Sequence, residues 1–263
     1  MEKIIDLSPQ SLIAVWGMIF VVLGIAMWQR LGITKNLIIG ALRCFLQLIL
    51  IGYIIGYIFN LNIWWAVVIF VIVMLIIATI TGGKRPEKVG AKGVYRIVGL
   101  SLTVGSVLTI FYVLEVVIRV KNWWEPQYMI PLAGMIIGNS MNGAALAVER
   151  LASEIDTNRK KIELSLALGA TSFQATKPYI NKSIRASLIP SINTMMVAGI
   201  VHLPGMMTGQ ILAGSSPIVA GKYQIMVMFM LPTSVTITSL LVAFQYYKKH
   251  FTRAFQLKEK YVD

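Results

Sequence analysis

Long apolar runs dominate this chain and restrict what it can fold into. A helix of about 20 apolar residues spans the hydrocarbon core of a bilayer, and seven runs of about this length alternate with polar stretches. Of the 263 residues, 57% are hydrophobic and 13% are charged, whereas soluble domains are about half apolar and about a quarter charged. We therefore expect an all-α, polytopic integral membrane protein with about seven transmembrane helices. The runs cover approximately residues 12–28, 37–59, 63–80, 94–118, 128–148, 186–213 and 223–247.

The polar stretches between these runs are too short to bury a core of their own. Residues 1–263 are therefore interpreted as one transmembrane domain, with a long polar loop at about 149–185. The acidic residues Glu2 and Asp6 precede the first run where a signal peptide would be basic, so we expect a retained helix there. Cys44 is the only cysteine, which excludes disulfides within the chain.

The net charge of +13 follows membrane topology and gives no reason to expect nucleic acid as a partner. Nineteen of the 24 lysines and arginines fall in the stretches after the first, third, fifth and seventh runs, and four fall on the opposite side. The positive-inside rule then predicts an extracellular N-terminus and a cytoplasmic C-terminus, with the long loop in the cytoplasm. Trp64, Trp65, Trp123 and Trp124 lie at the predicted outer edges, where an aromatic belt is expected.

The long loop contains a predicted helix–glycine–helix unit. Asp156 or Thr157 can cap a helix that runs through Leu168, and Gly169 then takes the left-handed position that ends many helices. Thr171 with Gln174 fits a capping box for a second helix, which Pro178 is expected to break or kink. Such a unit either rests on lipid headgroups as an amphipathic helix or docks onto a partner protein.

Glu163 followed six residues later by Gly169 resembles the coupling motif of ABC-transporter permeases, which sits in a groove of the ATPase subunit. The match to importers is partial. They usually carry Ala-Ala after the glutamate and Leu-Pro about 13 residues beyond the glycine, where this chain has Leu164-Ser165 and Asn181-Lys182.

A second resemblance covers most of the chain. Five motifs occur in order, and together they resemble the FetB-type iron-export permeases, which are relatives of plant aluminium-tolerance permeases. The motifs begin Arg43-Cys-Phe-Leu-Gln47, Ile130-Pro131-Leu-Ala-Gly134, Leu166-Ala-Leu-Gly169, Leu203-Pro204-Gly205-Met206-Met207 and Lys222-Tyr223-Gln224.

This resemblance implies a permease that pairs with a separate cytoplasmic ABC ATPase and serves metal homeostasis. The implied coupling residues are Glu163, Gly169, Ala170 and Thr171. The chain has no G-x-x-x-x-G-K-[ST] motif, so we expect no enzymatic activity and no cofactor in it. ATP and Mg²⁺ would bind to the partner.

A homodimer is also expected, because ABC permeases work in pairs. Three glycine pairs with a spacing of four residues allow close helix approach, either within one subunit or at a dimer seam. They are Gly52 with Gly56, Gly134 with Gly138, and Gly205 with Gly209.

Polar residues inside the runs are candidates for a substrate pathway. Asn139 and Asn142 share a face and either coordinate a hard cation or hydrogen-bond between helices. Arg43 and Gln47 lie one turn apart, and Arg43 can instead extend to the headgroups. Near an outer edge, Glu115 and Arg119 are expected to form an i,i+4 ion pair.

The sixth run is interrupted at Pro204, where freed backbone groups can line a cavity. His202, Met206 and Met207 flank the interruption and complete the candidate pathway. A histidine there is also explained as a satisfied polar group, and the methionines as packing. No HExxH, CxxC or carboxylate cluster marks a metal site.

We therefore expect the permease subunit of an ATP-driven exporter of iron or another metal ion or metal-linked solute, in the plasma membrane. Two other functions fit the same sequence. A secondary carrier or channel would transport without an ATPase, and a membrane regulator would bind a partner without transport.

Overall fold

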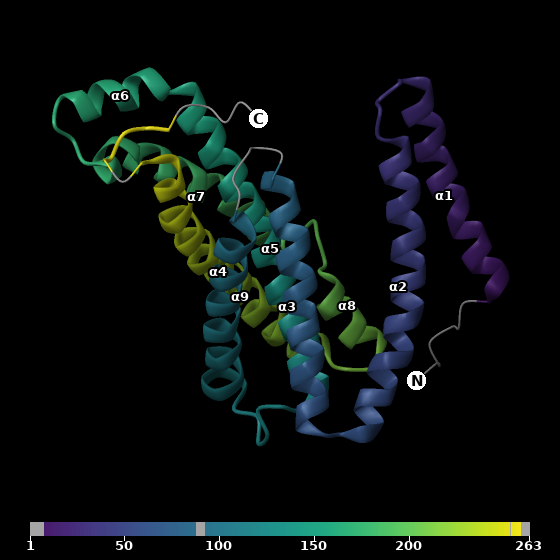
Figure 1. Ribbon diagram of the computed structural model, residues 1–263. Coiled ribbons are helices and arrows are strands. Elements are labelled where there is room, and N and C mark those ends of the chain that lie inside the picture. Colours follow the sequence, from purple (N-terminus) through teal and green to yellow (C-terminus); the bar gives the residue numbers. More distant parts are fainter. Residues whose placement is uncertain (1–7, 88–92, 253, 259–263) are drawn as a thin grey trace. The chain divides into compact units, whose positions relative to one another are not determined.

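The computed structural model describes residues 8–87, 93–252 and 254–258, which form helices joined by short links (Figure 1). The first half of the chain contains α1 (Pro9–Trp28), α2 (Thr34–Leu61), α3 (Trp64–Glu87), α4 (Val94–Phe111) and the π-helix η1 (Tyr112–Ile118). The second half contains α5 (Pro126–Thr157), α6 (Arg159–Ala167), α7 (Ser172–Val197), α8 (Gly205–Leu212), α9 (Pro217–Tyr246) and the 3₁₀-helix η2 (Tyr247–His250).

Six of the described helices are long and apolar enough to cross a membrane, which confirms a polytopic all-α membrane protein. The predicted run at 186–213 is the one that does not form a single helix. It is divided between the end of α7, a turn at 198–204 and α8. Gly199 in that turn has φ of 86°, a left-handed conformation that ends a helix. The predicted interruption is therefore present, and it starts six residues before Pro204.

The contacts of the chain divide it into two compact units. Unit 1 contains Met1–Ile63 and Leu212–Gly214, and unit 2 contains Trp64–Ile211 and Ser215–Asp263. A single domain over residues 1–263 stays a prediction, because contact density alone does not define an independently folding domain.

Unit 1 is built around the pair α1 and α2. Ser8 caps α1 by accepting a hydrogen bond from the Ser11 N–H at 3.2 Å, and the two helices are joined by a turn with Gly32 at φ of 70°. Trp16 and Phe45 contact edge to face across the pair, with ring centroids 5.7 Å apart. Most side chains of these helices are exposed, and only Ala26 and Ile58 are buried among those the structure describes, so the pair itself leaves much of its apolar surface uncovered.

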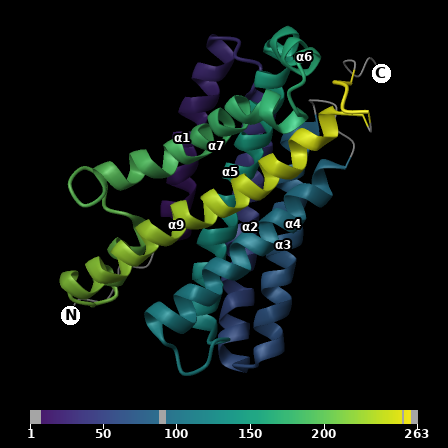
Figure 2. The same ribbon diagram turned by 90° about the vertical axis from the view of Figure 1, so that its left-hand side faces the viewer.

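Unit 2 is organised around α5, which packs against α3, α4, α7 and α9 (Figure 2). At 1.5 Å per residue, its 32 residues extend about 48 Å, well beyond the roughly 30 Å of a hydrocarbon core. The apolar run that predicts this helix ends at 148, but the helix continues to Thr157. The loop expected from 149 therefore begins as an extension of a transmembrane helix.

At two positions in unit 2, a glycine that is not part of a predicted pair lets neighbouring helices approach closely. A Cβ at Gly105 of α4 would lie 3.2 Å from the Thr238 backbone nitrogen of α9 and closer still to its hydroxyl. A Cβ at Gly143 of α5 would meet Val235 of α9 at 2.6 Å. Among the three predicted glycine pairs, only Gly134 faces a neighbouring helix, at 3.2 Å from Met74 Cε. The four-residue spacing therefore missed the glycines that the packing uses.

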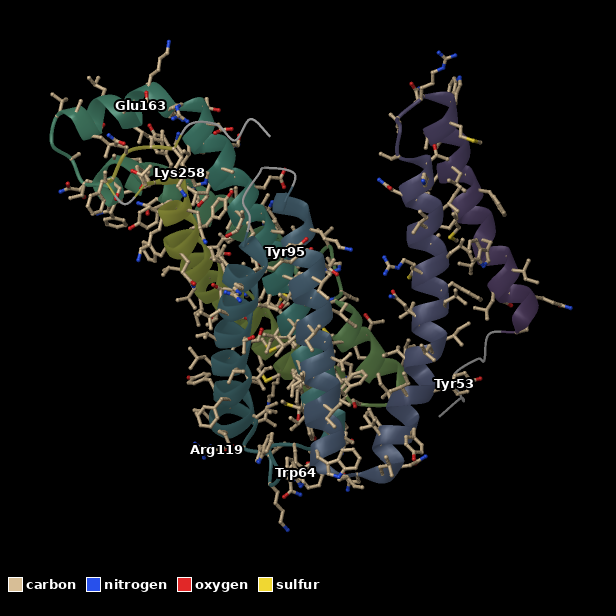
Figure 3. The ribbon with its side chains drawn as sticks, in the orientation of Figure 1. Tyr53, Trp64, Tyr95, Arg119, Glu163 and Lys258 are labelled. Carbon is tan, nitrogen blue, oxygen red and sulfur yellow. The ribbon has the colours of Figure 1, made fainter. Side chains whose placement is uncertain are left out.

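An apolar core continues past the membrane-length part of α5. The end of α5, the helix α6, the start of α7 and the end of α9 share it, and the chain segment after α9 closes it. We call this end of unit 2 the α6 end, and the opposite end the Trp64 end. Figure 3 shows Glu163 and Lys258 at the α6 end, and Trp64 and Arg119 at the other.

Candidate functional site

The predicted helix–glycine–helix unit is present at the α6 end. α6 ends at Ala167, and the turn that follows has Gly169 at φ of 91°. The Ala170 N–H donates to the Ser165 carbonyl at 3.0 Å across this turn. Nothing lies within 4 Å of a Cβ built on Gly169. The glycine is therefore required by its backbone conformation and not by a close neighbour.

The start of α7 is fixed by a reciprocal capping box. The Gln174 N–H donates to Thr171 Oγ1 at 3.2 Å, and the Thr171 N–H donates to Gln174 Oε1 at 2.9 Å. Two backbone donors of the first turn are thereby satisfied. The helix continues through Pro178 and Pro190, so of the two expected effects of Pro178, a break or a kink, the break does not occur.

The start of α6 differs from the prediction. Asp156 and Thr157 belong to α5, and Asn158 takes the capping position of α6 without a side-chain cap. The Asn158 amide instead donates to the Glu154 carbonyl at 2.9 Å. The two helices therefore join with a one-residue link, because the periodic apolar residues of α5 continue through Ile155 into the shared core.

The buried face of α6 packs on the protein itself. Ile162 has no exposed surface, and Leu166 lies against the same core. Phe173, at the start of α7, contacts Phe244 and Tyr247, with ring centroids 5.9 Å and 6.0 Å away. The Ile162 side of α6 therefore faces the protein core and is not free to rest on lipid headgroups.

A second apolar surface remains on α6. Leu164 is 63% exposed and Leu168 is 81% exposed. Because they are four residues apart, they lie next to each other on a side that does not face the core. Lys160 and Lys161 are exposed nearby. We call Leu164 and Leu168 the α6 leucine pair.

Glu163 pairs with Arg159, and their atoms Oε1 and Nε are 3.0 Å apart. Arg159 also donates to the carbonyl of Leu257 at 3.3 Å, so this arginine connects α6 to the C-terminal segment. Glu163, Ala170 and that segment line a hollow of about 430 Å³. Of the four coupling residues predicted from the motif, Glu163 and Ala170 thus line one exposed depression, and Gly169 and Thr171 do not.

Glu154 is a functional candidate that the sequence reading missed. Its side chain is 10% exposed and accepts from Arg150 at 2.7 Å and from Lys182 at 3.3 Å. These contacts tie α5 to α7 directly beside α6. Only the three-dimensional fold reveals the site, because Lys182 is 28 residues away along the chain.

The candidate pathway residues fall into separate places. Asn139 donates to the Met135 carbonyl at 2.8 Å and lines a hollow of about 90 Å³ between α5, α7 and α9, together with Thr194 and Met195. Ser140, its neighbour, faces Ser234 inside the bundle. Asn142 is exposed and does not line that hollow.

The interruption before α8 holds a different group. His202 is exposed, and its carbonyl accepts from the Gly199 N–H at 2.9 Å. Pro204 is buried, and the Met207 N–H donates to Gln224 Oε1 at 3.3 Å. Met206 is partly buried. None of these lines the hollow at Asn139.

Arg43 and Gln47 belong to α2 of unit 1, and both are exposed. Among the described residues, no group of three or more His, Cys, Asp or Glu side chains is placed to hold a metal ion. Five basic residues used for the topology prediction, Lys3, Lys88, Lys92, Arg253 and Lys260, lie outside the described residues.

Known proteins resemble the chain along nearly its whole length. Residues 9–251 match the family described as "Uncharacterised protein family (UPF0014)". The chain is 42% identical to "UPF0014 membrane protein slr1647" of Synechocystis, over 92% of this chain and 93% of that protein. It is 36% identical to "Protein ALUMINUM SENSITIVE 3" of Arabidopsis thaliana, over 88% and 82% respectively.

Another relative is "Probable iron export permease protein FetB" of Escherichia coli. The two chains are 30% identical over 96% of this chain and 95% of that protein. No solved structure matches the chain.

Proposed function

Because the chain belongs to the UPF0014 family of membrane proteins, we propose that it is the permease subunit of an ATP-driven transporter. Its working partner is a cytoplasmic ABC ATPase, which binds ATP and Mg²⁺, and its cargo is a metal ion such as iron or a metal-linked solute. The printed name of the Escherichia coli relative supports the cargo and the export direction.

The observation that carries the ATPase partnership is the α6 leucine pair. The core already uses the inward face of α6 through Ile162, yet Leu164 and Leu168 remain exposed beside the glycine turn. Exposed apolar residues on a protruding helix are typical anchors for a hydrophobic groove in a partner. Ile162 in the core and the hydrogen bond from Arg159 to the Leu257 carbonyl hold this helix in place, and the Glu154 pair with Lys182 joins α5 to α7 beside it.

A rigid connection matters because a coupling element must transmit movement. α5 is one continuous helix from the Trp64 end to Asn158, and α6 follows after a single residue. Displacement of α6 by a partner would therefore move α5 and, through Lys182, also α7. Both helices line the hollow at Asn139, which we propose as part of the substrate pathway.

The orientation follows from the basic residues. Lys160, Lys161, Lys177 and Lys182 belong to the α6 end, which we place in the cytoplasm by the positive-inside rule. The N-terminus is then outside, and two copies of the chain form the transport unit in the plasma membrane.

The partnership is tested by co-expression with a separate cytoplasmic ABC ATPase. We expect the wild-type permease to retain that ATPase during purification and to change its rate of ATP hydrolysis. Leu168→Asp should abolish retention, because it places a charge in the apolar contact. Asn181→Asp adds the same charge to an exposed position of α7 and should leave retention intact.

Equal retention by Leu168→Asp and the wild type would count against docking through α6. Metal flux into liposomes that contain this chain alone, without ATP, would contradict the proposal and favour a secondary carrier. ATPase retention without any flux of iron or competing metals in the complete complex would favour a regulator.

A further inference from the structure

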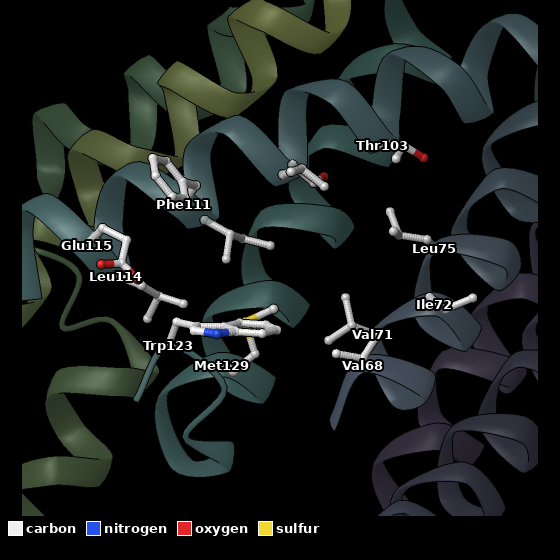
Figure 4. A pocket seen from close by; sticks show the side chains of 13 residues that line it. Val68, Val71, Ile72, Leu75, Thr103, Phe111, Leu114, Glu115, Trp123 and Met129 are labelled. Atoms are coloured by element: carbon white, nitrogen blue, oxygen red, sulfur yellow. The ribbon is translucent and has the colours of Figure 1, made fainter. Parts of the chain in front are cut away.

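An open groove runs along α3 and α4 on the side of unit 2 shown in Figure 4. Val71, Ile110 and Met129 are buried and form its floor. Ile72 and Phe111 stand exposed at its edges. Its volume is about 530 Å³, which is the size of a site for an organic molecule. The proposed metal cargo is much smaller than this groove, and the proposed ATPase binds at α6, so neither accounts for it.

The groove has the length and chemistry of an acyl-chain site. Its walls are mostly apolar, with seven valine, isoleucine and leucine side chains among the 13 that line it, and both α3 and α4 belong to membrane-length helical spans. From Thr103 to Glu115 it follows twelve residues of helix, or about 18 Å at 1.5 Å per residue. This distance corresponds to somewhat more than one leaflet of a hydrocarbon core of about 30 Å.

One end of the groove is charged. Glu115 is the only charged residue among the 13 that line it, and Figure 4 shows its carboxylate beside Leu114 at that end. The expected ion pair with Arg119 does not form. Glu115 lies in the π-helix η1, and Arg119 ends that helix at φ of 56°. Arg119 Nε instead donates to the Val116 carbonyl at 3.4 Å.

The geometry of η1 explains this difference. The i,i+4 pairing rule applies to two residues within one helix, whereas Arg119 follows the last residue of η1 and has a left-handed backbone conformation. The Glu115 carboxylate therefore has no ion pair among the described residues. Trp123, which is 46% exposed, lines the groove at the same end and suits the membrane interface.

Two cations stand close to this carboxylate in the sequence and belong to the same end of unit 2. Arg119 follows Glu115 by four residues, and the exposed Lys121 follows by six. An acid that lines the groove, followed in the sequence by two bases at the same end of unit 2, matches the charges of a headgroup that carries both an ammonium and a phosphate. The Trp123 ring adds an aromatic surface for the ammonium.

We propose that this groove binds a bilayer phospholipid with a zwitterionic amine headgroup, of the phosphatidylethanolamine type. One acyl chain lies between α3 and α4, the ammonium contacts Glu115, and the phosphate lies toward Arg119 and Lys121. This site does not depend on the ATPase or on the metal cargo.

Trp123 serves as the reporter in a test with the purified full-length chain in phosphatidylglycerol nanodiscs. The probes are phosphatidylethanolamine and phosphatidylglycerol with identical brominated acyl chains, which quench nearby tryptophan fluorescence. The signal of Trp123 is the difference between the wild type and Trp123→Phe. We expect the phosphatidylethanolamine probe to quench it at about a twofold to fivefold lower mole fraction, because a carboxylate–ammonium contact contributes up to about 1 kcal/mol.

Glu115→Gln should remove this preference while it leaves quenching by phosphatidylglycerol unchanged. Glu125→Gln is the matched control, because Glu125 precedes α5 at the same end of unit 2 but does not line the groove. Equal quenching by both probes in the wild type would overturn the proposal. A preference that survives in Glu115→Gln would overturn it as well. Disulfide-linked dimers of Val107→Cys in nanodiscs, without any Trp123 quenching, would show that a second copy fills the groove instead.

Discussion

Two faces of α4 show opposite kinds of packing. Toward α9, Gly105 allows backbone-to-side-chain contact with Thr238, and Ser101 accepts from the Gln245 amide at 3.1 Å. Toward α3, Val107 and Phe111 stay more than half exposed beside an open groove. A helix that packs this closely on one side is not loosely folded. Its open side is therefore available to an occupant from outside the chain, for which we propose a phospholipid.

The same contrast recurs on α6, where Ile162 is buried and Leu164 is exposed. There the proposed occupant is an ATPase. On both α4 and α6, the closely packed face holds the helix in the fold, and the exposed face is available to bind a molecule from outside the chain. Substitutions on the two kinds of face should therefore have very different effects.

The largest effect is expected at Ile162. Ile162→Ala leaves a cavity in the core of the α6 end and should lower the free energy of unfolding by about 2–5 kcal/mol. Leu164→Ala removes a similar side chain from the exposed face and should cost less than about 0.5 kcal/mol while it weakens ATPase retention. Thermal unfolding in detergent, paired with co-purification, measures both. Equal destabilisation by the two variants would break the comparison between the faces.

A somewhat smaller effect is expected at Gly105. Gly105→Val forces α4 away from Thr238 and should destabilise the chain by about 1–3 kcal/mol. Gly138→Ala is its control, since nothing lies within 4 Å of that Cβ. The thermal midpoint in detergent should fall for the first variant only. If the thermal midpoint of Gly138→Ala falls as far as that of Gly105→Val, the close contact between α4 and α9 does not explain the effect of Gly105→Val.

Glu154 tests whether charge as well as apolar packing joins α5 to α7 at the α6 end. Glu154→Gln should cost about 1 kcal/mol, because Arg150 and Lys182 are more than half exposed and become solvated once the carboxylate is removed. Glu163→Gln removes the more exposed pair with Arg159 and should cost less than about 0.5 kcal/mol. Chemical unfolding at low salt measures the free energy of unfolding of both variants. A larger loss for Glu163→Gln than for Glu154→Gln would contradict the proposed role of Glu154.

The smallest effect is expected at the capping box. Thr171→Ala removes the acceptor of the Gln174 N–H and should cost about 0.5–1 kcal/mol. Thr171→Ser keeps the hydroxyl and should be nearly neutral. Hydrogen exchange at the first turn of α7 is the measurement. Unchanged protection in Thr171→Ala would show that packing of Phe173 holds this turn without the cap.

Prediction from the sequence succeeded where neighbouring residues decide the structure. The capping box depends on Thr171 and Gln174, three residues apart, and Gly169 has the left-handed φ that its place after a helix indicates. The membrane-length helices follow from the apolar runs alone. Prediction failed where distant segments decide. The run at 128–148 gives no sign that α5 continues to Thr157, since α7 and α9 supply the core that covers its end.

The candidate site divides in the same way. The motif identified Glu163, Gly169, Ala170 and Thr171, and the structure brings Glu163 and Ala170 to one hollow. The pathway residues Asn139, Asn142, His202, Pro204, Met206, Met207, Arg43 and Gln47 were chosen by type, and the structure distributes them over different places. Residue type marks a polar group in an apolar run, but it does not tell which helix that group faces.

The sequence by itself therefore determined that this chain is a helical membrane protein of the UPF0014 family, with a glycine turn between two helices at its basic end. Hydropathy, charge and capping chemistry act over a few residues and need no knowledge of the fold. Only the tertiary structure decided which faces are filled and which stay open. Burial of Ile162, the pairing of Glu154 with Lys182 and the groove beside Glu115 each depend on helices from distant parts of the chain.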